Sequence, residues 1–254
     1  MIEPMASIAL KAARAGAQHI ARCYDRPDLI KISSEDNGVF TNVNDEVRKI
    51  IIGSLRDKYP EHFFPCSDPD NKTSDYEWLI SPLDGTKNFV RQIPHFSISI
   101  ACAFKGKLVH GVIVDPMRQE EFVASKGSGA TLNGKRIRVS DSAELKNGSV
   151  AGPLLSANKG KQLEGKLTEI GVMKYNLGSV ALDLAYVAAG KIDCLWSDTS
   201  EKGAIAAGIV LVREAGGLCA DFSGGAEHFN SGNIVAGNPK CLRDLCNLTR
   251  KFLV

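Results

Sequence analysis

The sequence predicts an α+β N-terminal half followed by an α/β C-terminal half. Residues 5–24 and 44–58 repeat apolar positions at intervals near 3.6, which is the period of an amphipathic helix. Short apolar strands separated by turn residues follow, and this order is typical of consecutive hairpins in an antiparallel sheet. From about residue 147 onward, strands alternate with helices, which favours a sheet covered by helices.

The N-terminal half contains the strongest strand signals. The segment 95–104 (HFSISIACAF) alternates between apolar and small polar residues, as a half-buried strand does. Asn44 is expected to cap the second helix, because its side-chain oxygen can accept a hydrogen bond from an unpaired backbone N–H group. Further strands are expected at residues 78–81, 108–115 and 120–125.

In the C-terminal half, capping residues predict where two of the helices begin. Ser179 is expected to cap an apolar helix that ends at Gly190, and Asn238 to cap the last helix with Pro239 in its first position. A buried helix is expected near residues 204–215. Strands are expected at residues 175–177, 193–196, 218–222 and 234–236.

The length and composition of the chain are ordinary for a compact globular protein. The 254 residues suffice for one large domain or two closely packed ones, and 44% are hydrophobic while 24% are charged. No long linker interrupts the chain. We therefore expect residues 1–145 and 146–254 to form two halves of one body.

Charge and cysteine content exclude several functional classes. The net charge of +2 gives no electrostatic reason to expect a nucleic-acid or membrane surface. The seven cysteines are odd in number and irregularly spaced, which favours free thiols in a reducing compartment. We see no secretory signal, and no apolar run approaches the ~18 residues that a membrane span requires. A cytoplasmic protein is expected.

One segment carries a specific resemblance. Residues 78–89 (WLISPLDGTKNF) resemble the signature of the inositol monophosphatase family, which reads Asp-Pro-Leu/Ile-Asp-Gly-Thr-x-Asn-Phe after a strand that begins with Trp. The resemblance extends along nearly the whole chain. Residues 181–190 (ALDLAYVAAG), 211–217 (LVREAGG) and 232–239 (GNIVAGNP) are similar to strings of its bacterial SuhB branch. It implies a layered α-β-α-β-α sandwich of the inositol monophosphatase / fructose-1,6-bisphosphatase type.

The resemblance also implies a chemistry. Enzymes of this family are Mg²⁺-dependent phosphatases of small phosphorylated alcohols, such as inositol phosphates. Two or three Mg²⁺ ions neutralise the phosphate, lower the pKa of the attacking water and hold the leaving oxygen. Because Mg²⁺ prefers carboxylates and water as ligands, such a site requires a cluster of Asp and Glu residues.

Part of this cluster is retained. By the resemblance, Asp84 corresponds to a metal-binding aspartate and Leu83 supplies a backbone carbonyl ligand. Thr86 corresponds to the threonine that orients the attacking water. The same resemblance makes Gly85 and Thr86, together with Gly178 and Ser179 at a helix start, candidate substrate-binding residues.

The remaining metal ligands are replaced. Ser67, Ser81 and Ala204 stand where the family has a glutamate and two aspartates. Supporting positions also differ: a lysine, two aspartates and a ring-contacting glutamate are replaced by Ser33, Gly38, Asn44 and Ser197. Even a tenfold loss for each of three ligands compounds to roughly a thousandfold. We therefore expect no tightly bound cofactor, and Mg²⁺ only if the family activity is retained.

Substitute ligands stay open as an alternative. Asp68 or Asp70 could replace Ser67 through a shift of register, and Glu201 could turn toward the place vacated by Ala204. A shift of one residue on a strand points a side chain to the opposite face, which argues against Asp68. Asp84 itself could simply bond to the backbone of its own turn.

Three functions remain in competition. The first, implied by the SuhB branch, is a catalytically inactive protein that binds Nus factors and RNA polymerase in transcription antitermination and ribosomal RNA maturation. The second is a Mg²⁺-dependent inositol-1-monophosphatase with atypical metal coordination. The third is a metal-free binder of a small phosphorylated ligand, helped by Lys87 or Lys202. The family also implies a homodimer.

Overall fold

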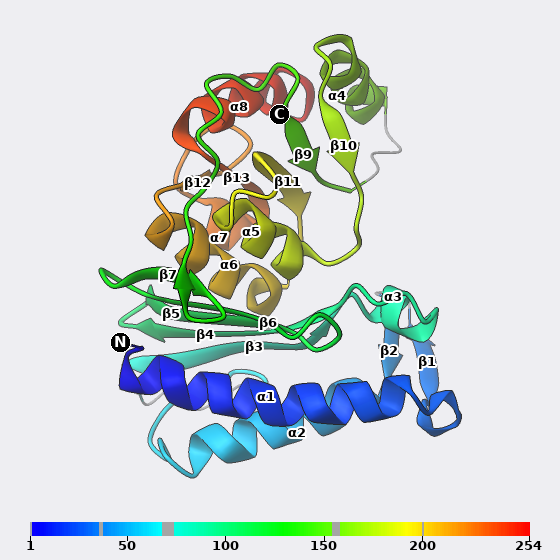
Figure 1. Ribbon diagram of the computed structural model, residues 1–254, viewed down its shortest axis with the longest axis vertical. Coiled ribbons are helices and arrows are strands. Elements are labelled where there is room, and N and C mark those ends of the chain that lie inside the picture. Colours follow the sequence, from blue (N-terminus) through cyan, green and yellow to red (C-terminus); the bar gives the residue numbers. More distant parts are fainter. Residues whose placement is uncertain (1, 36–37, 68–73, 154–157, 200) are drawn as a thin grey trace.

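The chain folds into five alternating layers of helices and sheets (Figure 1). The computed structural model describes residues 2–35, 38–67, 74–153, 158–199 and 201–254. One helix pair covers a six-stranded sheet, and a central helix layer separates it from a five-stranded sheet that two further helices cover. The expected α-β-α-β-α sandwich is confirmed.

The first layer consists of α1 (Pro4–Tyr24) and α2 (Asn42–Arg56). Gly16 permits their close packing, because a Cβ atom there would lie 2.9 Å from Ile98 Cδ1 and 3.0 Å from Val47 Cγ1. A short helical turn, η1 (Pro27–Leu29), and a hairpin of β1 (Ile32–Glu35) and β2 (Gly38–Thr41) connect the two helices. The sequence patterns did not indicate this hairpin.

The expected cap of α2 is wrong by three residues. Thr41 occupies the N-cap position, while Asn44 lies inside the first turn. The Asn44 side-chain oxygen accepts hydrogen bonds from the Thr41 backbone N–H at 3.0 Å and from its hydroxyl at 2.7 Å. Asn44 thus supports the start of the helix from within it.

The second layer is a sheet with the order β3-β4-β5-β6-β7-β8, and each neighbouring pair is antiparallel. This confirms the series of hairpins expected for the N-terminal half. Helix α3 (Thr86–Val90) follows the first strand directly. The strands are β3 (Tyr76–Asp84), β4 (Ser97–Phe104), β5 (Lys107–Asp115), β6 (Glu120–Ser125), β7 (Gly129–Leu132) and β8 (Lys135–Arg136).

The central layer contains α5 (Val180–Ala188), α6 (Lys202–Glu214) and the short α7 (His228–Ser231). Ser179 caps α5, as expected: its hydroxyl oxygen accepts from the Leu182 backbone N–H. Helix α6 lies very close to the six-stranded sheet, since a Cβ atom on Gly111 would come within 2.6 Å of the Ala207 carbonyl oxygen.

The second sheet has the order β10-β9-β11-β13-β12, parallel from β10 to β11 and antiparallel beyond. Asn238 caps α8, as expected. The strand expected at residues 175–177 instead ends at Tyr175, because the chain then leaves the sheet for the cap of α5. The elements are β9 (Ser149–Ala151), β10 (Met173–Tyr175), β11 (Cys194–Asp198), β12 (Leu218–Ala220) and β13 (Asn233–Gly237), with α4 (Asn158–Glu169) and α8 (Pro239–Phe252) outside.

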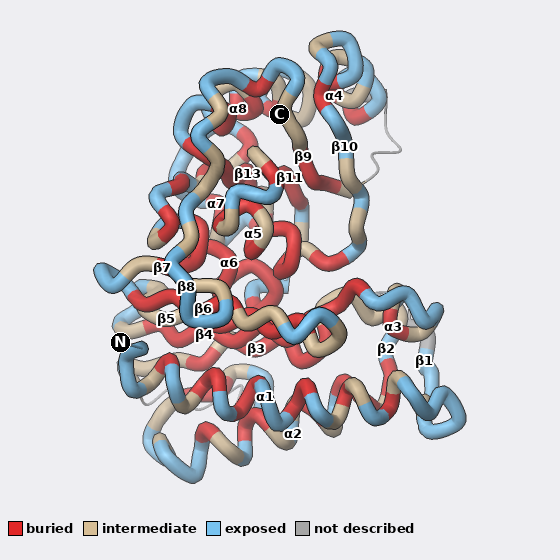
Figure 2. Tube along the Cα trace, in the orientation of Figure 1, coloured by how far each residue is buried: buried red, intermediate tan, exposed pale blue. Residues whose placement is uncertain are grey.

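A continuous apolar core joins the two halves of the chain. Ala101 and Ile113 of the first sheet belong to the same buried cluster as Ile205 of α6 and Ile234 of the second sheet. Figure 2 shows the buried stretches on the surfaces between layers. The division of the chain at residues 145/146 stays a prediction. Among the described residues, no helix combines the length and hydrophobicity needed to span a membrane.

Asp193, just before β11, connects the second sheet by hydrogen bonds to the segment that precedes β9. Its Oδ1 accepts hydrogen bonds from the hydroxyls of Ser140 and Ser142, both at 2.6 Å. Its Oδ2 accepts from the backbone N–H of Ser149 at 2.8 Å and from the Ser149 hydroxyl at 2.9 Å. Burial alone would raise the pKa of Asp193, but these hydrogen bonds hold it below its usual value.

We expect Asp193→Ala to lower the free energy of unfolding by about 2–3 kcal/mol at pH 7, because several hydrogen bonds to a carboxylate are lost. A depressed folded-state pKa stabilises the fold above the unfolded pKa of about 3.9, and that stabilisation disappears as pH falls through the folded-state value. Urea unfolding at pH 7 and near pH 3 should therefore show the difference shrinking. Asp141→Ala, at an exposed position, is the control and should change little.

Candidate phosphate and metal site

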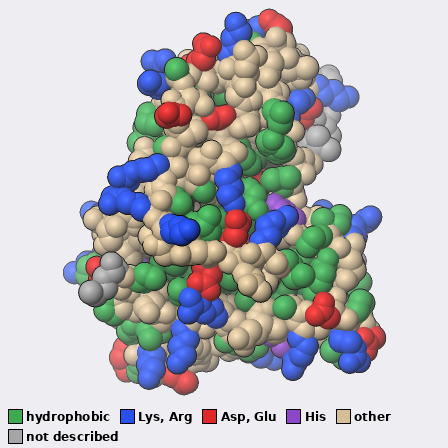
Figure 3. Space-filling model, in the orientation of Figure 1, with side chains coloured by type: hydrophobic (Ala, Val, Ile, Leu, Met, Phe, Trp, Pro, Cys, Tyr) green, Lys and Arg blue, Asp and Glu red, His purple; other side chains and the backbone are tan. Residues whose placement is uncertain are grey.

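The signature residues line a cavity of about 1000 Å³ where several helices and strands meet. The end of β3, the start of α3, the first turn of α2 and the residues before α5 and α6 all contribute side chains or backbone. Figure 3 shows a hollow in the surface of the molecule. By comparison with Figure 1, which has the same orientation, this hollow lies between α3 and the end of β10. The fold thus brings together segments from both halves of the chain.

A glycine turn sets the geometry of the signature. Gly85 has a φ of 92°, and a Cβ atom there would lie 2.9 Å from the His95 carbonyl oxygen, so a side chain is excluded. The turn places the Thr86 hydroxyl 2.9 Å from the Leu83 carbonyl oxygen, to which it donates. Asn44 Nδ2 donates to the same hydroxyl at 3.2 Å. The Leu83 carbonyl, Thr86 and Asn44 therefore form one connected group.

Asp84 is bonded across the site to the start of α5. Its Oδ2 accepts from the Ser179 hydroxyl at 2.6 Å and from the Ala181 backbone N–H at 2.8 Å. The alternative in which Asp84 simply bonds to the backbone of its own turn does not describe these contacts, which cross to another element. Burial raises the pKa of Asp84 to about 6, although the bonds from Ser179 and Ala181 oppose the shift and the charge of Glu201 adds to it.

Asp183 is a second buried carboxyl that sequence reasoning missed. It lies one turn into α5, and burial together with the neighbouring Asp84 raises its pKa to about 8. Its Oδ1 has no hydrogen-bond partner among the described residues. The available signal was an acidic residue within the apolar run at residues 180–189. Asp183 and Ser197 line an adjoining cavity of about 410 Å³ together with Asp84.

The three replaced ligand positions now serve other contacts. The Ser67 hydroxyl accepts a hydrogen bond from Arg56 Nη2 at 2.9 Å, so a guanidinium lies beside the position that the resemblance assigns to a metal-binding glutamate. The Ser81 hydroxyl donates to Glu201 Oε1 at 2.6 Å. Ala204 is buried in the first turn of α6. No negative charge remains at any of the three positions.

Glu201 reaches the site, which sequence reasoning left as an alternative. It occupies the N-cap position of α6 and lines the same cavity as Asp84. The reason is the close approach of α6 to β3: a Cβ atom on Gly203 would lie 2.7 Å from the Ile80 carbonyl. Of the described residues that line the cavity, only Asp84 and Glu201 carry carboxylates. Asp68 and Asp70, the other proposed substitutes, lie outside the described residues.

Some of the residues predicted to bind an anion already make hydrogen bonds within the protein. Gly178 lines the cavity, but the Ser179 hydroxyl and the Ala181 N–H both donate to Asp84. Lys87 lines the cavity. Lys202 does not, because its ammonium lies 5.1 Å from the centre of the Phe229 ring. Of the two lysines predicted as alternatives, Lys87 is therefore the one at the cavity.

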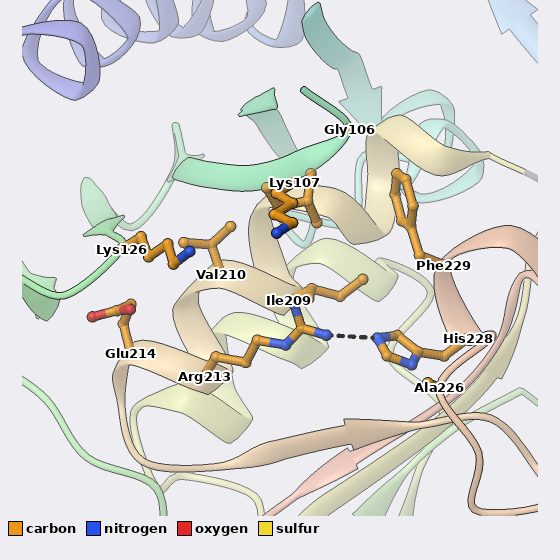
Figure 4. A pocket seen from close by; sticks show the side chains of 11 residues that line it. Gly106, Lys107, Lys126, Ile209, Val210, Arg213, Glu214, Ala226, His228 and Phe229 are labelled. Carbon is orange, nitrogen blue, oxygen red and sulfur yellow. Dashed lines mark hydrogen bonds between the residues drawn. The ribbon is translucent and has the colours of Figure 1, made fainter. Parts of the chain in front are cut away.

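A separate cavity of about 370 Å³ lies between the β4–β5 hairpin and α6. Figure 4 shows Arg213, whose Nη2 donates to His228 Nε2 at 3.1 Å, together with Lys107 and Lys126. Both oxygens of the Glu214 carboxylate accept backbone hydrogen bonds, from Gly127 and Gly129. No signature residue lines this cavity, so the chemistry of the signature belongs to the larger one.

Comparison with known proteins agrees with the fold and the signature. The chain is 40% identical over 270 aligned residues to the Pseudomonas aeruginosa protein named Nus factor SuhB, covering 99% of this chain and 98% of that protein. The crystal structure of the extragenic suppressor protein SuhB from Bartonella henselae is similar with a TM-score of 0.87 and 32% identity, over 96% of this chain and 98% of that one.

The Thermotoga maritima inositol monophosphatase (IMPase) is similar with a TM-score of 0.87 and 28% identity, over 97% of each chain. The model of the inositol monophosphatase family matches residues 1–252. Sequence, fold and signature lead to one assignment: this chain belongs to the inositol monophosphatase family.

Proposed function

We propose that this chain is a SuhB-like protein that binds components of the transcription machinery and does not act as an ordinary Mg²⁺-dependent phosphatase. One observation carries the proposal. Among the described residues that line the cavity, only Asp84 and Glu201 carry carboxylates. Ser81 lines it without a charge, and Ser67 and Ala204 do not line it. The catalytic fold is kept, but most of its metal ligands are not.

The charge balance argues against a magnesium cluster. Two or three Mg²⁺ ions bring four to six positive charges, and the two lining carboxylates carry at most two negative ones. Asp84, with a pKa of about 6, is partly protonated in mildly acidic solution. Arg48 and Lys87, which line the cavity, add positive charge to it. Mg²⁺ dehydrates reluctantly, so such a site holds at most one ion weakly.

The remaining residues are occupied by structural contacts. Thr86, the candidate for orienting an attacking water, donates its hydroxyl hydrogen to the Leu83 carbonyl oxygen. That carbonyl oxygen is itself the candidate backbone ligand. Asp84 uses one oxygen to hold the start of α5. Each retained group therefore has a role in the fold that is independent of metal and phosphate.

The proposed partners follow from the relatives. Proteins named Nus factor SuhB are 40% identical to this chain over nearly its full length, in Pseudomonas aeruginosa and also in Escherichia coli. By this similarity we propose Nus factors and RNA polymerase as partners, and a homodimer as the assembly. Such binding depends on the protein surface, so it tolerates loss of the metal ligands.

A second candidate, a phosphatase with atypical metal coordination, is favoured by Glu201. Its carboxylate lies next to Ser81, where the family has a metal-binding aspartate. Together with Asp84 and the Leu83 carbonyl, it offers three oxygen donors to one ion. Metal-free binding of a phosphorylated ligand has less support, because Asp84 already occupies the Ser179 hydroxyl and the Ala181 N–H.

The first test concerns magnesium. We expect millimolar Mg²⁺ to leave the melting temperature of the metal-free chain unchanged, because an ion that binds the native state must stabilise it by mass action. Calorimetry should likewise detect no sub-millimolar binding. Stabilisation by Mg²⁺ that disappears in Glu201→Gln would support the atypical phosphatase instead.

The second test restores the missing ligands. We expect the triple variant Ser67→Glu, Ser81→Asp and Ala204→Asp to hydrolyse inositol 1-phosphate measurably in Mg²⁺, and each single variant to remain inactive, because metal ligands act jointly. An aspartate at position 81 would meet Glu201, so adding Glu201→Gln should improve the triple variant. If the unmodified chain already matches the turnover of the triple variant, the proposal of an inactive enzyme is wrong.

The third test concerns partners. The purified chain should co-elute from a sizing column with Nus factors or with RNA polymerase carrying them. Glu201→Gln, which removes a charge from the cavity without changing its shape, should bind equally well. Failure of the folded chain to associate with any of these proteins would contradict the proposed role, whatever the outcome of the magnesium experiments.

A further inference from the structure

We propose that His19, Cys23 and Glu46 form a binding site for a zinc-like divalent cation on the outer helix pair. None of the three lines the cavity of the signature. His19 and Cys23 lie four residues apart on α1 and therefore on one face of it, and Glu46 projects from the first turns of α2. Their donor atoms all lie within 4.8 Å of one another.

The distances suit a tetrahedral ion. His19 Nε2 lies 2.6 Å from Glu46 Oε2, and Cys23 Sγ lies 3.6 Å from His19 Nε2. Metal bonds of about 2.0–2.3 Å at tetrahedral angles separate donor atoms by roughly 3.3–3.8 Å. The ion would thus push the imidazole and the carboxylate apart by about 1 Å, while Cys23 Sγ already lies at a suitable distance from His19 Nε2.

The donor set selects the kind of metal. An imidazole, a thiolate and a carboxylate together suit Zn²⁺ or Co²⁺, whereas Mg²⁺ prefers oxygen ligands alone. This chemistry separates the site from the oxygen-lined cavity of Asp84. Three protein ligands leave the fourth position to water or to a ligand from solution.

The surroundings hold the ligands in place. Asn42 Nδ2 donates to Glu46 Oε1 at 2.9 Å, which leaves Oε2 directed at His19. Cys23 is buried, while 43% of the Glu46 side chain is exposed. An ion can therefore enter from the side of Glu46 and reach a thiol that is screened from solvent.

In the metal-free protein, Arg22 favours the His19 tautomer that cannot bind a metal through Nε2. Its Nη2 lies 3.1 Å from His19 Nδ1, and because a guanidinium only donates, Nδ1 must accept. His19 then carries its proton on Nε2 and donates it to Glu46. Metal binding requires an unprotonated Nε2, so the imidazole proton moves to Nδ1 and the exposed Arg22 side chain turns away. The Cys23 thiol releases its proton to solvent when it binds the ion.

Cobalt titration of the reduced, metal-free, full-length chain tests the site. We expect one equivalent of Co²⁺ to produce a thiolate-to-cobalt charge-transfer band, which Zn²⁺ then displaces. Cys23→Ser should abolish the band, and His19→Gln should weaken binding by more than about 100-fold. Glu46→Gln should weaken binding by roughly tenfold while keeping the band. Cys66→Ser, at an exposed cysteine outside the cluster, is the matched control.

Arg22 supplies an independent test that does not remove a ligand. Arg22→Gln should tighten Co²⁺ and Zn²⁺ binding several-fold, because the competing bond to Nδ1 is lost and a positive charge is removed. The proposal is overturned if the folded chain gives no band, if the band survives Cys23→Ser, or if Arg22→Gln weakens binding. Circular dichroism of each variant distinguishes a lost ligand from a lost fold.

Discussion

The rest of the structure depends on the bonds from Asp84 to the start of α5. Asp84 ends the first strand of the N-terminal sheet, and Ser179 and Ala181 begin the central helix of the C-terminal half. A carboxylate at a helix N-terminus satisfies free N–H groups and suits the helix dipole. This contact therefore joins the two halves at the cavity itself. It also gives Asp84 a structural role that does not depend on metal.

The same contact explains the electrostatics of the site. Asp84 and Asp183 are both buried near the start of α5, and both have raised pKa values because burial disfavours their charged forms. The charge of Glu201 raises the pKa of Asp84 further. In a family enzyme, metal ions compensate such repulsion. Under the proposed function, neutral side chains at Ser67, Ser81 and Ala204 keep this repulsion from growing in the absence of metal.

Sequence patterns predicted those parts of the molecule that local chemistry determines. The caps at Ser179 and Asn238 follow from a polar residue before a helical run, and the glycine turn at Gly85 follows from the signature. The hairpins of the first sheet follow from alternating strands. Asn44 was misplaced by one turn because Thr41, three residues earlier, is an equally good cap.

The site residues that were missed or left open depend on distant contacts. Glu201 is 120 residues from Ser81, and it reaches that hydroxyl only because Gly203 lets α6 lie against β3. Asp183 appeared as one polar residue in an apolar helix, and nothing local indicates that Asp84 lies beside it. Lys202 is a neighbour of Glu201 in sequence, but it points to Phe229 instead. Such placements follow from the packing of layers, which no local pattern encodes.

The two candidate ion sites of this chain differ in the way their ligands are assembled. The signature cavity gathers oxygen donors from β3, the loop before α6 and a backbone carbonyl, so a change in any layer alters it. The His19, Cys23 and Glu46 cluster needs only the pairing of α1 with α2, which Gly16 fixes through its contacts with Val47 and Ile98. A helix pair held by a close apolar contact is a rigid support for ligands on its rim. Substitutions in the cavity are therefore expected to leave the proposed outer site unchanged, and the reverse should hold as well.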